Sequence, residues 1–300
     1  SRRTRRLIIR KTDSEFCAGN SYRHQQTTTM KIKNSIALVL GSGKGLGMET
    51  GMALARAGAT VIFTHYDWPE ESARMREEVA ALGGNHRTFK VDLRKPDQIK
   101  RLLSSIQDEF DRLDILINNI ERGGMPIVHG EYVPDQWQLE LDTTLTSKWW
   151  VFHHSLPLLK ASGDGIVINI SSVAGIIGRA GPAGLIFNDG YAACNRAVSS
   201  FTETWARQAA PEVRVNELML GIFRGRHAEN TRGWELLSED QRKALLGQTL
   251  LQRSGDGDDL IRAIFFLIED APYMTGSVIR LDGGFTLGHS PTPPMPEGVE

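Results

Sequence analysis

The stretch that decides the fold runs from residue 36 to residue 47 and reads Ile-Ala-Leu-Val-Leu-Gly-Ser-Gly-Lys-Gly-Leu-Gly. Its five apolar residues predict a buried strand, and a helix is predicted to follow to about residue 57. In the turn between them, Gly41 permits a tight bend, Gly45 lets backbone N–H groups approach a pyrophosphate, and Gly47 lets the helix pack on the sheet. A strand, a glycine turn and a helix in this order predict a dinucleotide site, with a flexible loop as the alternative.

The alternation of strand and helix continues along the chain. Short apolar runs predict strands at 36–40, 60–63, 88–91, 115–117, 166–170, 213–218 and 278–281. The clearest helical pattern covers 96–110, where apolar residues recur on one face. Because the strands are solid apolar runs, helices are expected on both faces of the sheet. The sequence therefore predicts an α/β fold, a single domain with a doubly wound parallel sheet and ligands at the carboxyl ends of its strands.

Composition excludes several classes of protein. The chain has 300 residues, a formal net charge of −1, 40% hydrophobic and 24% charged residues, which is unlike a disordered chain, a collagen or a disulfide scaffold. The longest apolar run, 263–268, falls short of the ~18–20 residues that a membrane helix needs. With only Cys17 and Cys194, nothing indicates an oxidising compartment. We expect a cytoplasmic protein with no nucleic-acid partner and no membrane partner.

Both ends of the chain differ from its middle. Residues 1–30 carry a net charge of +5, and four readings compete: a transit peptide, a basic arm, an expression remnant, or sequence upstream of a start at Met30. The last two are favoured, with little fixed structure expected there. Residues 289–300 form a proline-rich tail. The predicted nucleotide-binding domain is therefore 31–288.

Later segments of the sequence resemble the motifs of a known family. Residues 116–119 read Leu-Ile-Asn-Asn, 168–175 read Ile-Asn-Ile-Ser-Ser-Val-Ala-Gly, 191–195 read Tyr-Ala-Ala-Cys-Asn, 214–216 read Arg-Val-Asn, and 274–284 end in Leu-Asp-Gly-Gly. Together with the glycine turn, and in this order, they resemble the short-chain dehydrogenase/reductase family over about residues 30–287. The resemblance implies a Rossmann-like fold with seven parallel strands, hydride transfer between NAD(P) and an alcohol/carbonyl pair, and a homodimer or homotetramer.

The resemblance also implies the catalytic residues. Ser172 takes the place of the serine that hydrogen-bonds the substrate oxygen, and Tyr191 that of the general acid/base. Two of the catalytic positions depart from the family pattern, because Asn195 stands where the family has a lysine and Thr144 where a helix asparagine maintains a water relay. Taken alone, Ser172 reads as an ordinary strand-end turn and Tyr191 as a half-buried core residue.

The cofactor residues follow from the same resemblance. They are Gly41, Ser42, Lys44, Gly45, Leu46, Gly47, His65, Asp92, Leu93, Asn119, Asn195 and Gly221. Lys44 could meet a 2′-phosphate, which favours NADP over NAD. Asp67 lies near the separation expected for an acid that binds the ribose of NAD, but a turn or helix cap is favoured for it. Asp92 resembles the adenine-contacting aspartate and reads equally well as a strand-end turn acid.

The substrate region is expected after Gly221. There 222–227 lead into a predicted helical segment at 234–246 that could act as a lid. Arg224, Arg226 and His227 could bind an anionic substrate, although a solvated basic face is favoured. His153 and His154 lack partners at metal-ligand spacing, so no metal site is predicted. Cys194 reads as a packed side chain rather than a nucleophile.

Three functions are compatible with these features. The leading one is an NAD(P)-dependent short-chain oxidoreductase that reduces a carbonyl with Tyr191 as general acid, similar to 3-oxoacyl-carrier-protein reductases. The alternative is a catalytically silent relative that binds nucleotide as a sensor or as a subunit of an oligomer. A structural protein would require Ile120 and Glu121, which replace the family's Ala-Gly, to block the cleft.

One prediction follows from the lost lysine. With the neutral Asn195 in its place, the phenol of Tyr191 is expected to keep its ordinary pKa of ~10 and to stay protonated at pH 7. A neutral phenol donates a proton well and accepts one poorly, so carbonyl reduction should be faster than alcohol oxidation. Forward and reverse rates near pH 7 test this expectation. Faster oxidation, after allowance for the reaction equilibrium, would contradict it.

Overall fold

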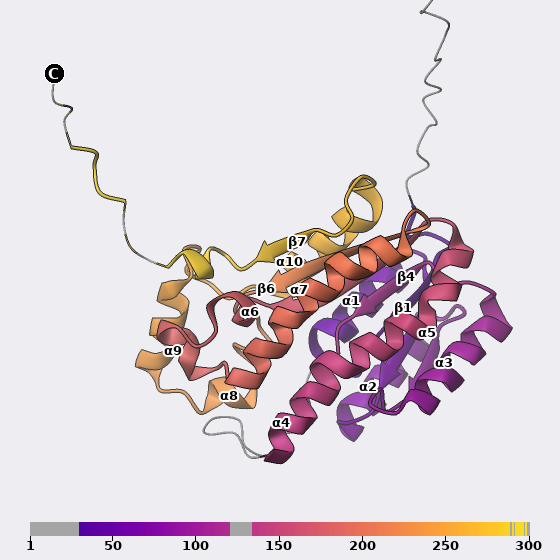
Figure 1. Cartoon of the computed structure of the whole chain (residues 1–300). Coiled ribbons are helices and arrows are strands. Elements are labelled where there is room, and N and C mark those ends of the chain that lie inside the picture. Colours follow the sequence, from indigo (N-terminus) through magenta and orange to yellow (C-terminus); the bar gives the residue numbers. More distant parts are fainter. Residues whose placement is uncertain (1–29, 121–133, 289, 291, 297, 299–300) are drawn as a thin grey trace, which may run out of the picture.

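Seven parallel strands form one sheet in the computed structural model, which describes residues 30–120, 134–288, 290, 292–296 and 298 (Figure 1). The strands are β1 (Ile36–Val39), β2 (Thr60–His65), β3 (Arg87–Lys90), β4 (Ile115–Asn118), β5 (Gly165–Ser172), β6 (Val213–Leu220) and β7 (Val278–Leu281). Every predicted strand is confirmed to within two residues at each end. The predicted α/β class, with a doubly wound sheet in a single domain, is confirmed as well.

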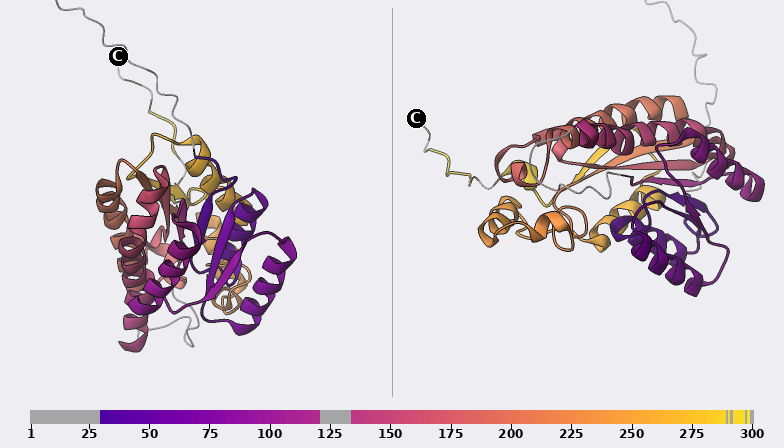
Figure 2. Two further views of the ribbon diagram at one scale, coloured as in Figure 1. Left: turned by 90° about the vertical axis from the view of Figure 1, so that its right-hand side faces the viewer. Right: turned by 90° about the horizontal axis from the view of Figure 1, so that it is seen from below.

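Helices cover both faces of this sheet (Figure 2). The longer ones are α1 (Gly45–Arg56), α2 (Pro69–Leu82), α3 (Pro96–Phe110), α5 (Ser147–Ser162), α7 (Asp189–Ala209), α9 (Glu239–Gln248) and α10 (Gly257–Phe265); the shorter ones are α4 (Pro134–Glu140), α6 (Ala174–Ile177) and α8 (Arg232–Glu235). Helices α1, α2 and α10 pack on one face and α3, α5 and α7 on the other. The helix predicted at 96–110 is confirmed as α3.

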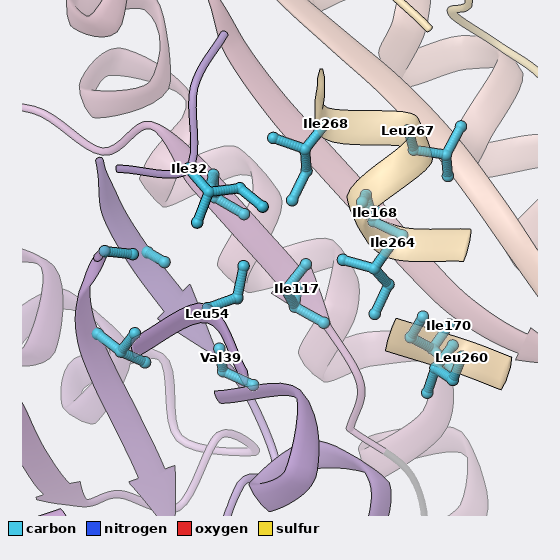
Figure 3. Packing of buried hydrophobic residues seen from close by; sticks show 14 of the residues in the cluster. Ile32, Val39, Leu54, Ile117, Ile168, Ile170, Leu260, Ile264, Leu267 and Ile268 are labelled. Atoms are coloured by element: carbon cyan, nitrogen blue, oxygen red, sulfur yellow. The ribbon is translucent and has the colours of Figure 1, made fainter. Parts of the chain in front are cut away.

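The core is split by the sheet because neighbouring strand residues point to opposite faces. In β1, Ala37 and Val39 pack toward α1 and α10, whereas Ile36 and Leu38 pack toward α3 and α5. Figure 3 shows the first of these layers, in which Val39 lies among isoleucines and leucines from β4, β5, α1 and α10. Burial on both faces explains why the strands read as uninterrupted apolar runs.

The strand order β3-β2-β1-β4-β5-β6-β7 reverses direction between β1 and β4. From β1 the chain continues to β2 and β3 at one edge of the sheet, and from β4 it continues to β5, β6 and β7 at the other edge. In such a sheet the connections diverge at the reversal and leave a crevice at the carboxyl ends of the strands. The glycine turn after β1 and Asn119 after β4 flank this point.

The single helical segment predicted at 234–246 is wrong. The chain instead forms the short helix α8 and then α9, with a break between them. Ser238 causes the break, because its side chain accepts a hydrogen bond from the Gln241 backbone while the Gln241 side chain accepts one from the Ser238 backbone. This reciprocal capping starts a new helix at Glu239.

The basic N-terminal segment falls almost entirely, and the proline-rich tail in part, outside the described part of the chain. Residues 1–29, and 289, 291, 297 and 299–300 of the proline-rich tail, are not described, so the expectations for both ends stay predictions. Among the helices that the structure does describe, none is long and apolar enough to span a membrane.

A chain of polar side chains crosses the core from β4 to β6. Asn118 donates to the Asn169 side-chain oxygen at 3.1 Å, and Asn169 donates to the Thr202 hydroxyl at 2.9 Å. Thr202 in turn donates to the Glu217 carboxylate at 3.3 Å. Ser171 and Ser199 donate to the same carboxylate. These contacts tie three strands to α7 within the interior.

Glu217 should make stability depend on pH. Burial raises its pKa, although hydrogen bonds from the Ser171, Ser199 and Thr202 hydroxyls offset part of the increase. A raised pKa in the folded state means that the stabilising contribution is present below the ordinary Glu pKa of ~4.3 and is lost as pH rises through the folded value. Relative to Glu217→Gln, the wild type should therefore lose free energy of unfolding as pH rises.

Urea denaturation at several pH values measures this difference, because titrating groups common to both proteins cancel. At high pH, each unit by which folding raises the Glu217 pKa lowers the free energy of unfolding of the wild type by about 1.4 kcal/mol relative to the variant. Parallel stability curves for the two proteins would contradict the prediction.

Candidate functional site

A pocket of about 680 Å³ opens at the carboxyl ends of β1, β2 and β4. Ten of the residues predicted for cofactor binding or catalysis line it: Gly41, Lys44, Gly45, Leu46, Gly47, His65, Asp92, Leu93, Asn119 and Tyr191. The volume lies in the range of cofactor and substrate pockets. One continuous pocket thus holds both the glycine turn and the predicted catalytic phenol.

The glycine turn has the geometry that its sequence predicts. Gly41 has φ +64°, a left-handed conformation that side chains rarely adopt. A Cβ added to Gly47 would lie 2.6 Å from Asn119 Nδ2 and closer still to the Gly41 carbonyl oxygen. The first turn of α1 therefore packs directly against the backbone of the glycine turn, and its N-terminal N–H groups face the pocket. Such an end attracts phosphate charge.

Ser42 supports the turn from below rather than lining the pocket. It is fully buried, and its hydroxyl lies 2.9 Å from the Val39 carbonyl oxygen, to which it donates. The same hydroxyl accepts a hydrogen bond from the Thr64 backbone at 2.8 Å. Ser42 therefore fixes the turn against β2.

Aromatic and cationic side chains surround the far end of the pocket, next to β2 and β3. Lys44 Nζ lies 3.4 Å from the centre of the Trp68 ring, a cation–π contact. Trp68 precedes α2 with φ +62°, and its side chain does not cap that helix. Of the two roles favoured for Asp67, a turn or a helix cap, the structure shows the first, because Asp67 lies in the bend before α2; it also lines the pocket.

Two titratable groups mark the ends of β2 and β3. Burial lowers the pKa of His65, and the nearby Arg76 and Lys90 lower it further, so the imidazole is neutral at pH 7. Burial alone would raise the pKa of Asp92, but hydrogen bonds and charge from Arg94 outweigh burial and lower it. Arg94 binds both carboxylate oxygens of Asp92, at 2.8 and 2.9 Å.

Tyr191 lies in the first turn of α7 and is held by its neighbours. Asn188 caps the helix by accepting a hydrogen bond from the Tyr191 backbone at 2.9 Å. The phenol ring stacks on Phe187, with ring centres 5.8 Å apart, and meets the edge of His227 at 5.2 Å. The ring is 6% exposed, yet it lines the pocket.

The other predicted catalytic residues do not line the pocket. Ser172, at the end of β5, is fully buried, and its hydroxyl accepts a hydrogen bond from the Ala174 backbone at 3.2 Å. Thr144 is 1% exposed in a π-helical segment (Leu141–Thr146) and donates to the buried Glu140. No hydrogen bond between Ser172 and Tyr191 occurs among the described residues. The roles assigned to Ser172 and Thr144 stay predictions.

Asn195 and Gly221 also lie outside the pocket lining. Asn195 is 1% exposed and donates to the Tyr191 backbone carbonyl at 2.9 Å, while its side-chain oxygen is buried and has no partner among the described residues. A Cβ added to Gly221 would lie 2.7 Å from the Asp282 backbone, so this glycine allows β6 and β7 to pass closely. Both residues shape the framework of the site.

The sequence analysis misjudged Arg226 and His227. Both are half-buried and line the pocket, so the solvated basic face favoured for this segment is wrong at these two positions. The Arg226 guanidinium reaches the Tyr191 hydroxyl at 3.3 Å and the Asn119 side-chain oxygen at 3.5 Å. Arg224, two residues earlier, is exposed as expected.

Cys194, one position before Asn195, behaves as the sequence predicts. The thiol is 1% exposed, and burial, with a smaller contribution from Glu140, raises its pKa to about 12. It therefore stays protonated and unreactive near neutral pH. Ile120 does line the pocket, while Glu121 lies outside the described residues.

Comparison with known proteins agrees with this geometry. The profile of a family described as enoyl-(acyl carrier protein) reductase matches residues 41–286. The chain belongs to the short-chain dehydrogenase/reductase family. It is 32% identical to the 3-oxoacyl-(acyl-carrier-protein) reductase FabG of Vibrio cholerae over 259 residues, which cover 85% of this chain and 98% of the relative.

Two further matches extend the comparison. The FabG of Thermotoga maritima is 29% identical over 262 residues, covering 86% of this chain and all of the relative. The crystal structure of gox2181 superposes with a TM-score of 0.74 at 22% identity over 86% of this chain and 97% of that one, and this match supports the fold alone. As a member of the short-chain dehydrogenase/reductase family, the protein is an oxidoreductase whose relatives use a nicotinamide cofactor.

Gly47→Ala tests the glycine turn as the nucleotide site. The added methyl group would collide with the Gly41 carbonyl and push α1 away from the turn. We expect the affinity for NADPH to fall at least tenfold, measured as the change in NADPH fluorescence on titration. The matched control is Gly247→Ala in α9, where an added Cβ meets nothing within 4 Å. Equal affinities in the two variants would contradict the assignment.

Proposed function

We propose that the protein is an NADPH-dependent reductase of small carbonyl compounds in which Tyr191 donates the proton. The observation that carries the proposal is that the Tyr191 phenol lines the same pocket as the glycine turn. A phosphate-binding turn and a proton donor in one cavity are the two parts that a dinucleotide-dependent reduction needs.

The residues present fit a nicotinamide dinucleotide. The N-terminus of α1 and the turn at Gly41–Gly47 would hold the pyrophosphate, and Gly47 leaves no room there for an added side chain. Asp92 and Leu93 would lie along the adenine, and Asn119 along the ribose nearer to Tyr191. When bound, the reduced nicotinamide supplies the hydride that adds to the carbonyl carbon.

The charged side chains near β2 favour NADP over NAD. Lys44 is held over the Trp68 ring at the mouth of the turn, where it can pair with a 2′-phosphate. His65 ends β2 at the position where an acid would bind the ribose hydroxyls, and it carries no negative charge. Asp67 and Glu71 do line the pocket, but Arg94 is close enough to Asp67 to be stabilised by it, which reduces the repulsion of a phosphate.

Tyr191 then does the proton chemistry. Its O–H bond breaks as the proton passes to the substrate oxygen, and the phenolate recovers a proton from solvent. Leu139, Ile186 and Trp234 line the neighbouring wall and would contact an apolar part of the substrate. The Ser172 hydroxyl accepts from the Ala174 backbone, which leaves its own O–H to donate, so it would add a hydrogen bond to a substrate oxygen that reaches its buried position.

The buried positions of Ser172 and Asn195 favour one alternative. If neither side chain reaches the pocket, the protein could bind the nucleotide without turning it over, as a sensor or an oligomer subunit. Binding of NADPH without consumption of any carbonyl substrate would establish this alternative. Turnover establishes the reductase.

Tyr191→Phe provides the decisive variant. The wild type should consume NADPH faster than NADH with a panel of ketones and 3-oxoacyl thioesters. Removing the phenol hydroxyl should lower kcat by roughly 10²- to 10⁴-fold, the usual contribution of a general acid, while NADPH affinity stays nearly unchanged. The measurement is the loss of NADPH absorbance under saturating substrate.

Tyr273→Phe is the matched control, because Tyr273 is fully exposed and does not line the pocket. It should retain wild-type kcat. A wild-type kcat in Tyr191→Phe as well would remove Tyr191 from the mechanism.

A further inference from the structure

A positively charged side chain contacts the Tyr191 hydroxyl, although α7 carries none at the position where the family has a lysine. Four residues after Tyr191, the neutral Asn195 bonds the Tyr191 backbone rather than its hydroxyl. The charge comes instead from Arg226, whose Nη2 donates to the Tyr191 hydroxyl oxygen at 3.3 Å. Arg226 thereby joins Tyr191 to Asn119, which contacts the glycine turn.

The backbone of Arg226 is fixed by the turn that carries it. The backbone N–H groups of Arg226, His227 and Ala228 all donate to the Phe223 carbonyl oxygen, at 3.0 to 3.1 Å. Gly225 donates to the Glu229 carbonyl at 2.7 Å. Phe223 itself is 2% exposed. These hydrogen bonds fix the backbone from which the guanidinium extends.

The phenol is fixed as well, so the contact does not depend on two mobile side chains. Phe187 stacks on one face of the Tyr191 ring, and His227, the residue after Arg226, packs against it edge-on. Phe187 and His227 also contact each other, with ring centres 5.1 Å apart. The three rings aim the hydroxyl toward Arg226.

We infer that Arg226 supplies the positive charge that activates the Tyr191 phenol, in place of a lysine in α7. Arg226 is a positioning residue, since it acts through Tyr191. The inference rests on the proposed function, in which Tyr191 is the proton donor. An arginine stays charged across the whole useful pH range. Half-buried beside a phenol, it stabilises the phenolate that remains after proton transfer and lowers the pKa of the phenol.

Other charged groups near Tyr191 are His227, whose ring contacts it, and the pair Glu140 and Lys148. Glu140 and Lys148 act on Cys194, one turn further along α7, with opposite signs. Lys148 donates to the Ile120 carbonyl oxygen. Among the described residues, Arg226 is the charged group with a direct hydrogen bond to the hydroxyl.

This inference revises the expected titration of Tyr191. A pKa below ~10 leaves the phenol mostly protonated at pH 7, so reduction stays favoured there, but more phenolate forms toward pH 9. Oxidation of the alcohol, which needs the phenolate as base, should therefore increase over that range. The same charge helps both directions of the reaction.

The experiment titrates Tyr191 directly, without ligand or turnover. Ultraviolet difference spectra of each protein against its own Tyr191→Phe version report the phenolate of this residue alone. In the wild type Tyr191 should titrate below ~10, and in Arg226→Gln the midpoint should rise by about one to two units. In Arg226→Lys the Tyr191 midpoint should stay close to the wild-type value, because lysine keeps the positive charge. Arg224→Gln, in the exposed part of the same turn, should leave the midpoint unchanged.

The pH profile of reduction provides a second readout. Because the protonated phenol is the donor, kcat/KM should decrease as pH rises through the Tyr191 pKa, and in Arg226→Gln this decrease should move to higher pH by the same amount as the spectroscopic midpoint. A merely structural role would lower the rate without moving the profile.

Three results would overturn the inference. The first is a wild-type Tyr191 that titrates at or above ~10, which needs no variant to fold. The second is equal midpoints in wild type and Arg226→Gln. The third is tighter NADPH binding and faster turnover in Arg226→Gln, which would show that the side chain obstructs the pocket. A low Tyr191 midpoint in a protein that reduces no carbonyl would sustain the inference about charge and reject the proposed function.

Discussion

The contact between the first turn of α1 and the end of β1 is the constraint on which the site depends. Because Gly47 rests on the Gly41 carbonyl, the helix N-terminus is held at the reversal of strand order between β1 and β4. Asn119, after β4, lies against the same turn. Arg226 then connects Asn119 to Tyr191 across the pocket. The position of the phenol relative to the glycine turn thus follows from a chain of backbone and side-chain contacts.

The fold could be predicted because its strands carry their own signal. A strand covered on both faces must be apolar at every position, and the run at 166–170 or 213–218 shows this without help from its neighbours. Strand ends were less well defined, since β5 and β6 each continue by two residues through Ser172 and Leu220. Those extra residues are held by pairing with a neighbouring strand, which a single sequence does not display.

The site could be predicted where its residues are close together in the sequence. The glycine turn and the ends of β2, β3 and β4 follow directly from strand positions, and Tyr191 follows from the order of motifs. Ser172 and Asn195 were placed by resemblance, and the packing of α6 and α7 buries both. Arg226 could not be recognised from the sequence as a partner of Tyr191. The two residues are 35 positions apart, and only the fold of the turn after β6 brings them together. A basic residue in a loop looks the same in a sequence whether it faces solvent or a phenol.

The turn that carries Arg226 is anchored outside the pocket. Phe223 pairs with Gly255 in an isolated bridge, and a Cβ added to Gly255 would lie 2.6 Å from the Phe223 ring. Any larger residue there would displace Phe223, and with it the carbonyl oxygen to which three backbone N–H groups of the turn are bonded. The residue at position 255 therefore controls the contact between Arg226 and Tyr191 from outside the pocket, through the backbone of the turn alone.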